Sequence, residues 1–297
     1  MDFLTRCLNR QISHDFLAER ETKKKRKGRG NLKKYFAIIF AFCSLILFFS
    51  GSAFAVSNSP IHWGFKKARN EVPPEAGEYY DELLKKYDAF YKGSPDEKTV
   101  YLTFDNGYEN GYTDKILDVL KKEKVPATFF VTGHYLESAP DLVKRMVEEG
   151  HIVGNHSWSH PDFTQLTDER IVQELDKVKE KTKELTGQKE MLFVRPPRGI
   201  LSERTLKVSR EAGYIHVLWS LAFVDWKTDQ QQGWQYAYNE IMKQIHPGAV
   251  ILLHTVSKDN ADALEKAIVD IKKRGYTFKS LNDYLLKESL DNKNMIY

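Results

Sequence analysis

Two histidines four residues apart are the first residues in this sequence whose type and spacing could do chemistry. They belong to the run Asn155-His156-Ser157-Trp158-Ser159-His160. On one side of a helical turn, the imidazoles of His156 and His160 would be close enough to bind a single metal ion. Two structural histidines with satisfied hydrogen bonds use the same spacing, so the pair alone leaves both interpretations open.

Other polar residues that could do chemistry follow short apolar runs. They are Asp105-Asn106-Gly107 after Val100–Phe104, Arg195-Pro196-Pro197-Arg198-Gly199 after Leu192–Val194, Asp225-Trp226 after Ile215–Leu221, and His254 after Val250–Leu253. Singly, each has an ordinary structural explanation as a turn, a solvated arginine or a core histidine. Together with the histidine pair they place polar groups at five successive strand ends, as one funnel-shaped site requires. The other histidines interpreted as structural, because each lacks a matching partner, are His134, His151, His216 and His246.

The apolar runs indicate strands, and helical patterns lie between most of them. Two further strands are expected at Ala127–Val131 and Ile152–Gly154. Helices are expected from near Ser138 to Gly150, from Thr167 to Gly187 and from about Ala261 to Arg274. Strands that alternate with helices are joined by crossovers and run parallel. The sequence therefore predicts an α/β fold, an open or distorted (β/α) barrel, with its chemistry at the carboxyl ends of the strands.

The charge of the chain is unevenly distributed. Of a net charge of +4, residues 1–34 carry +7 and the remainder carries −3. Nucleic-acid binding needs a basic folded surface, so no nucleic-acid partner is expected. The two cysteines, Cys7 and Cys43, both precede residue 56, which excludes a thiolate metal site in the part expected to fold.

An apolar segment at residues 35–55 follows the basic tail of residues 1–34. It is a signal peptide if the chain is cleaved near Ala53-Phe54-Ala55, or a transmembrane anchor if it is retained, since about 20 apolar residues span a bilayer. Either way, the basic flank stays in the cytoplasm and the remainder is exported, to the outer face of the membrane or the cell wall. The expected order beyond the segment is a spacer and N-terminal extension (56–98, with a helix from Glu75 to Tyr91), a catalytic domain (99–287) and a C-terminal tail (288–297).

The wording and order of these motifs resemble the polysaccharide deacetylase family, carbohydrate esterase family 4. The motifs are Thr103-Phe104-Asp105-Asn106-Gly107, His156-Ser157-Trp158-Ser159-His160, Arg195-Pro196-Pro197-Arg198-Gly199, Asp225-Trp226 and Leu252-Leu253-His254. The longer run Phe104-Asp105-Asn106-Gly107-Tyr108-Glu109-Asn110 is similar to one branch, the muramic δ-lactam-forming de-N-acetylases that act on the cortex peptidoglycan of spore-forming bacteria. The resemblance implies a hydrolase that removes N-acetyl groups from the glycan strand of peptidoglycan, at N-acetylmuramic acid, as the step leading to muramic δ-lactam.

The resemblance also implies a role for each candidate residue. A divalent metal, Zn²⁺, would be bound by His156, His160 and Asn106, and would activate a water. Asp105 would be the general base, fixed and kept ionised by Arg195. His254, oriented by Asp225, would protonate the departing amine. A backbone N–H near Tyr108 would bind the oxyanion, and Trp226 would form a wall of the pocket, unless it only packs in the core.

Asn106 departs from the family pattern, which has an aspartate as the anionic metal ligand at this position. An amide oxygen is neutral, so we expect weaker metal binding. Two alternatives to the muramic activity follow. The chain could remove acetyl groups from N-acetylglucosamine in peptidoglycan or chitin-like oligomers, or it could be a non-catalytic wall-binding protein. The retained base, histidines, arginine and acid favour the enzyme.

Overall fold

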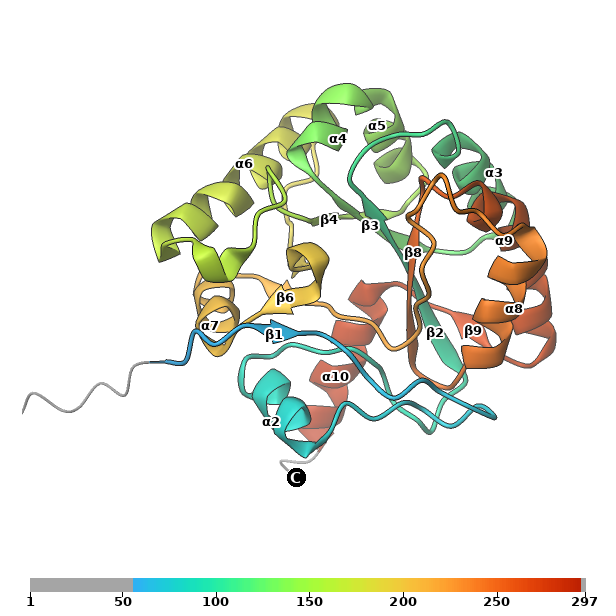
Figure 1. Ribbon diagram of the computed structural model, residues 1–297, viewed down its shortest axis with the longest axis horizontal. Helices are drawn as coiled ribbons and strands as arrows, with labels where there is room; N and C mark the ends of the chain where they lie inside the picture. The colour runs from blue at the N-terminus through green and yellow to red at the C-terminus, as the bar shows by residue number, and fades with distance from the viewer. Residues whose placement is uncertain (1–55, 295–297) are drawn as a thin grey trace, which may run out of the picture. The chain divides into compact units, whose positions relative to one another are not determined.

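A parallel sheet of seven strands forms the centre of the computed structural model, which describes residues 56–294 (Figure 1). The strand order is β7-β5-β4-β3-β2-β8, and β9 also pairs with β2. The strands are β2 (Thr99–Asn106), β3 (Ala127–Val131), β4 (Ile152–Asn155), β5 (Phe193–Val194), β7 (Ile215–His216), β8 (Ala249–His254) and β9 (Thr277–Phe278). All of the pairings within this sheet are parallel, as the alternation of strands and helices predicts.

The central strands β2 and β3 are buried along their whole length. Such strands are covered on both faces, which explains why they are nearly continuous apolar runs. The register of β2 with β8 places Asp105 opposite His254. Two residues that are 149 positions apart in the sequence therefore meet at the same edge of the sheet.

The segment that follows β7 joins the two edges of the sheet. The Val217 N–H donates to the Val194 carbonyl of β5 at 2.8 Å, and four residues later Leu221 forms a parallel bridge with Ile251 of β8. The chain thus crosses from one end of the strand order to the other. The sequence predicts one strand over Ile215–Leu221, but only Ile215–His216 is a strand, because the remainder changes partners on the way to β8. The predicted distorted barrel is confirmed.

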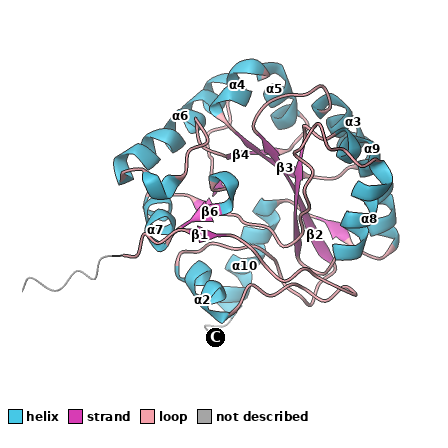
Figure 2. Cartoon of the chain, in the orientation of Figure 1, coloured by secondary structure: helices cyan, strands magenta, loops and turns pink. Residues whose placement is uncertain are grey.

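Helices cover the outside of the curled sheet, in an arc that Figure 2 shows from α6 through α4, α5 and α3 to α9 and α8. They are α3 (Thr113–Glu123), α4 (Gly133–Ser138), α5 (Pro140–Glu148), α6 (Asp168–Thr186), α7 (Glu203–Glu211), α8 (Trp234–Gln244) and α9 (Lys258–Lys273). Helix α6 matches its prediction at both ends, because Thr167 caps the first turn and Gly187, at a φ of 74°, ends the helix. Helix α9 begins three residues before the predicted Ala261, since Ser257 caps it by accepting from the Asn260 N–H.

Residues 56–98, predicted to be a spacer, pack against the rest of the described chain. Strand β1 (Ile61–His62) pairs antiparallel with β6 (Ile200–Leu201). Leu83 and Leu84 of α2 (Glu78–Lys86) lie in a buried cluster with Leu201, Leu206 and Leu218. The compact unit therefore starts at Val56 rather than at residue 99. Helix α2 is shorter than the predicted 75–91, because Gly77 precedes it and Asp88, in a left-handed conformation, follows it.

The last helix, α10 (Leu281–Asn294), continues past residue 287, where the sequence predicts the start of a tail. Its Tyr284 stacks on Phe90 with ring centroids 4.0 Å apart, which connects the helix to the core. Among the described helices, none is long and apolar enough to cross a membrane. The predicted basic tail, residues 1–34, and the apolar segment, residues 35–55, lie outside the described residues.

Candidate active site

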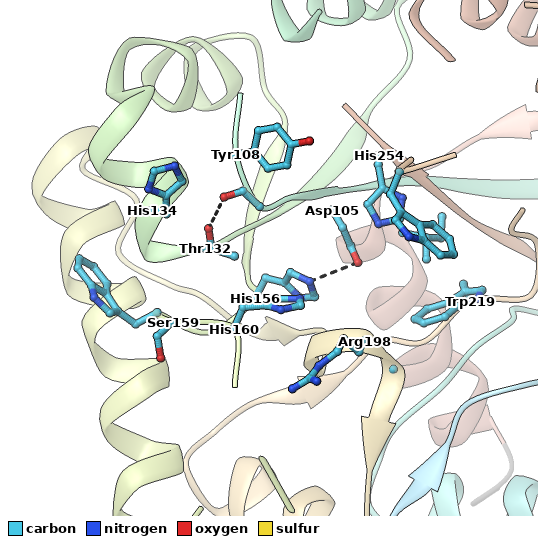
Figure 3. A pocket seen from close by; sticks show the side chains of 15 residues that line it. Asp105, Tyr108, Thr132, His134, His156, Ser159, His160, Arg198, Trp219 and His254 are labelled. Carbon is cyan, nitrogen blue, oxygen red and sulfur yellow. Dashed lines mark hydrogen bonds and ion pairs between the residues drawn. The ribbon is translucent and has the colours of Figure 1, made fainter. Parts of the chain in front are cut away.

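A cavity of about 680 Å³ opens where the strands end (Figure 3). Its lining includes residues at or beside the carboxyl ends of four neighbouring strands: Asp105 one residue before the end of β2, Thr132 after β3, His156 after β4 and His254 at the end of β8. Parallel strands present their carboxyl ends at one edge, so this convergence follows from the sheet topology. Figure 3 shows Asp105 between His156 on one side and His254 on the other.

The orientation of the Asp105 carboxylate is fixed by a buried arginine, Arg195. Arg195 Nη1 donates to Asp105 Oδ1 at 2.8 Å, and Nη2 donates to Thr103 Oγ1 at 2.9 Å. The Arg195 side chain is completely buried, and its guanidinium lies 4.2 Å from the centre of the Phe130 ring. Burial alone would raise the pKa of Asp105, but the charge of Arg195 and the nearby His156 hold it below its usual value. Arg195 therefore fixes the orientation of the Asp105 carboxylate through Oδ1. The second oxygen, Oδ2, lies on the side of His156.

The histidine pair comes from a loop rather than from the predicted helical turn. Ser157 and His160 have left-handed backbone conformations, with φ of 65° and 56°. The loop is held by the Ser157 N–H, which donates to Asn155 Oδ1 at 2.9 Å, and by the His160 N–H, which donates to Ser157 Oγ at 3.0 Å. The two imidazole centroids are nevertheless 4.9 Å apart. The prediction of proximity holds, but its stated cause, helical spacing, is wrong.

Both imidazoles have the electronic state that a metal ligand needs. His156 Nδ1 lies 2.9 Å from the Arg195 carbonyl, to which it donates its proton, leaving Nε2 as the acceptor atom 3.5 Å from Asp105 Oδ2. This outer contact to a carbonyl is the usual way to orient a ligating histidine. Burial lowers the pKa of His156, and burial together with His156 lowers the pKa of His160 to about 4. Both rings are therefore neutral at neutral pH, with lone pairs free to bind a cation.

Asn106 supplies a further oxygen but no charge. Its Nδ2 donates to Thr255 Oγ1 at 2.9 Å, whereas Oδ1 is buried without a hydrogen-bond partner. Within residues 56–294, no group of three His, Cys, Asp or Glu side chains is arranged to hold a metal ion. The two neutral imidazoles fit a divalent ion, whereas Asn106 does not line the cavity and is a candidate neutral ligand only by its place in the chain next to Asp105.

His254, on the opposite side of Asp105, has a different environment. Its Nδ1 donates to Asp225 Oδ1 at 2.7 Å, and its backbone N–H donates to Asp225 Oδ2 at 2.8 Å. Burial disfavours the charged imidazole, but the carboxylates of Asp225 and Asp105 outweigh it and raise the pKa of His254 above its usual value. With Nδ1 occupied, Nε2 is the atom that can give a proton to a bound molecule.

Two aromatic residues near the acid line the cavity. Trp226 is 48% exposed, and its ring centroid lies 5.5 Å from that of His254, so it is a wall of the pocket rather than a core residue. Tyr108 is 44% exposed on the loop after β2. Exposed aromatic faces of this kind can pack against a sugar ring.

Sequence reasoning missed several residues that line the cavity. They are Thr132, His134, Trp158, Ser159, Arg198 and Trp219. His134 was interpreted as structural because no partner was visible in the sequence. Arg198 belongs to the same motif as Arg195, but it has a φ of 59° and an exposed side chain, whereas the Arg195 side chain is buried. Gly199 is the sequence feature that could have indicated this part of the cavity wall, because a Cβ at this position would lie 2.7 Å from the Trp219 ring.

Comparison with known proteins assigns this arrangement to one group. The family model described as polysaccharide deacetylase matches residues 92–217. The peptidoglycan-N-acetylmuramic acid deacetylase PdaA of Bacillus subtilis is 55% identical over 84% of this chain and 95% of its own length. The solved structure of Bacillus subtilis PdaA, a family 4 carbohydrate esterase, superposes with a TM-score of 0.77 at 57% identity, over 78% of this chain and all of that one.

A more distant relative has a different sugar in its name. A peptidoglycan-N-acetylglucosamine deacetylase of Bacillus cereus is 36% identical over 67% of this chain and 72% of its own length. The two relatives share the reaction class and differ in the sugar.

Proposed function

Because the chain belongs to the polysaccharide deacetylase family, the family 4 carbohydrate esterases, we propose that it removes the N-acetyl group of N-acetylmuramic acid in peptidoglycan. The predicted enzyme class, a hydrolytic polysaccharide N-deacetylase, is confirmed by these relatives. The sugar is the finer part of the proposal. It is supported by the relative named for N-acetylmuramic acid and by one feature of the cavity.

That feature is a cationic side chain without an internal partner. Arg198 lines the cavity together with His160, and after burial and His156 its charge adds to the lowering of the pKa of that imidazole. Among residues 56–294, no hydrogen bond or ion pair of the Arg198 side chain is present, whereas Arg170 and Arg204 pair with Glu174 and Asp168. Arg198 is exposed, so a positive charge at the lining of the cavity is accessible to an anionic part of the substrate.

N-acetylmuramic acid has an anionic group at the required place. Its lactyl ether stands at C3, next to the C2 acetamide that is hydrolysed, and ends in a carboxylate when no stem peptide is attached. N-acetylglucosamine has a hydroxyl at C3 and offers Arg198 no charge. The muramic sugar therefore gains a charge-assisted pair that the glucosamine sugar lacks. Once the amine is free, the same carboxyl can close on it to form the δ-lactam with loss of one water.

We propose Zn²⁺ as the bound metal, held by His156 and His160 with Asn106 as a neutral third ligand. A divalent ion bound there polarises the acetamide carbonyl and lowers the pKa of a water molecule. Asp105 uses Oδ1 to pair with Arg195, which leaves Oδ2 to accept the proton of the attacking water. Asp105 is ionised at neutral pH, so it is in the correct state to act as the base.

His254 completes the hydrolysis on the other side of the bond. The C–N bond of the tetrahedral intermediate breaks only when the nitrogen is protonated, because an amide anion is a poor leaving group. His254 gives this proton from Nε2, while Asp225 on Nδ1 holds the ring in its charged form. The products are acetate and the free C2 amine. The Tyr108 backbone N–H, near the mouth of the cavity, is the proposed donor to the oxyanion.

The test is acetate release and mass spectrometry on peptidoglycan whose muramic residues have lost their peptides. We expect deacetylated muramic acid, part of it as the cyclic lactam, and intact N-acetylglucosamine. The Arg198→Met variant should raise KM about ten- to a hundredfold, the range for a lost hydrogen bond to a charged group. Arg69→Met, an exposed arginine outside the cavity lining, is the matched control. Deacetylated glucosamine beside intact muramic acid would overturn the sugar assignment and leave the enzyme class intact.

We further propose that the folded part acts outside the cytoplasm, with the membrane as a partner through residues 35–55. The support is the basic run before this apolar segment and a wall polymer as substrate. A reporter that works only in the cytoplasm, fused after Tyr297, should be inactive. An active reporter would contradict the topology.

A further inference from the structure

Asn260, in the first turn of α9, contacts both members of the His254–Asp225 pair. Its Nδ2 donates to Asp225 Oδ2 at 2.5 Å and lies 3.2 Å from the His254 carbonyl. The side chain is 1% exposed, and its Oδ1 has no hydrogen-bond partner. An amide buried with one oxygen unsatisfied is costly, so the contacts of its nitrogen need an explanation.

Capping of α9 does not explain it. The cap is Ser257, whose Oγ accepts from the backbone N–H of Asn260. The Asn260 side chain takes no part in that bond and points instead to the carboxylate of another element. The Asn260 side chain therefore acts on the Asp225 carboxylate rather than on the end of the helix.

Asp225 is the member of the pair that needs support. It lies on an irregular segment after Leu221, whereas His254 is the last residue of strand β8. Two amides connect this segment to the start of α9. Asn260 binds the carboxylate, and Gln231 donates to the Asp225 carbonyl at 3.1 Å while accepting from Ser257 Oγ at 2.8 Å.

The carboxylate of Asp225 is fixed by three donors. Oδ1 accepts from His254 Nδ1, and Oδ2 accepts from the His254 backbone N–H and from Asn260 Nδ2. With Oδ2 held on two sides, the carboxylate cannot rotate, and Oδ1 stays in line with the imidazole. A neutral donor does this without adding a charge to the environment of His254, which already includes Asp225, Asp105 and Arg195.

We propose that Asn260 is a positioning residue for the general acid, acting on His254 through Asp225. Asn260 does not itself line the cavity, and its contact with His254 is to the backbone carbonyl, so its effect on the imidazole must pass through the Asp225 carboxylate. The inference rests on deacetylation itself, and it holds whichever sugar is the substrate. Failure of the muramic assignment would leave it untouched.

The first test is a double-mutant cycle with the full enzyme, measuring acetate release from peptidoglycan. Asn260→Leu has a similar volume and no donor. It should lower kcat about ten- to a hundredfold, the range for a lost hydrogen bond to a charged group, and leave KM within about twofold. In an Asp225→Asn background the same substitution should change kcat less than about twofold, because its target is gone. Equal losses in both backgrounds would overturn the proposal.

If Asn260→Leu does not fold, a second variant tests whether Asn260 positions the general acid. Asn260→Asp keeps the shape and places two carboxyl groups in contact, which then share one proton. While that proton is present, it replaces the amide donor, so kcat should be near that of the wild type at acidic pH. The ratio of variant to wild-type kcat should fall as the pH rises and the shared proton is lost. A ratio that does not change with pH would refute the role, since a purely structural asparagine has no such signature.

Discussion

The two sides of the cavity use the same residue type for opposite purposes. On one side, His156 and His160 lie in a loop after β4, and burial keeps them neutral. On the other side, His254 at the end of β8 is half-buried, and its pKa is raised. The difference lies in what Nδ1 meets, a backbone carbonyl at His156 and a carboxylate at His254. The neutral contact suits the metal ligand that we propose at His156, and the charged contact suits the acid that we propose at His254.

Asp105 stands between the two sides, so its loss should have the largest effect. Asp105→Asn keeps the shape and removes the proton acceptor, and we expect a rate loss of about 10²- to 10⁴-fold, the range for one general base. Metal affinity should be largely kept. Acetate release and isothermal titration measure the two quantities. A variant within tenfold of the wild type would remove Asp105 from its role.

The next prediction separates the two sides directly. His156→Ala or His160→Ala should abolish most of the Zn²⁺ affinity and most of the activity, because these imidazoles supply the principal donors. His254→Ala should lower the rate by about 10²-fold or more while leaving Zn²⁺ affinity unchanged. Isothermal titration of the three variants tests the contrast. If His254→Ala also loses the metal, the division into a metal side and an acid side is wrong.

Asp225→Asn should lower the pKa of His254, so that this histidine becomes neutral like His156 and His160. The proposed mechanism needs protonated His254, so the rate should fall as the pH rises through the pKa of this residue, which is raised above its usual value in the wild type. Burial lowers this pKa, and the Asp225 carboxylate is the largest cause that raises it. Without the carboxylate, the alkaline limb of the kcat profile should therefore move to lower pH. A limb that stays in place would show that another group gives the proton.

Asn106→Asp should give the smallest effect, on the metal side alone. The new carboxylate adds one negative charge, and we expect Zn²⁺ affinity to rise about tenfold, since affinity follows the charge of the ligands. The alkaline limb set by His254 should move little. Unchanged Zn²⁺ affinity in the titration would mean that Asn106 is not a ligand of the metal.

Strands and site residues were predictable wherever the local pattern is strong. Continuous apolar runs marked β2, β3 and β8, and Thr167 and Gly187 marked both ends of α6. Helices α3, α7 and α8 were not individually predicted, because their polar faces interrupt the apolar pattern. The packing of residues 56–98 was also missed, since their few apolar residues have partners such as Leu218 that lie far away in the sequence.

The sequence by itself determined which functional groups are present at the strand ends and the order of the motifs that contain them. Only the tertiary structure decided which atoms meet. It placed Asp105 opposite His254 through the register of β2 with β8 and brought the histidines together in a loop where Ser157 and His160 are left-handed. It also left Arg198 at the lining of the cavity without a side-chain partner among the described residues. The physical reason is that protonation states and ligand geometry depend on burial and on contacts between distant segments, which no local pattern contains.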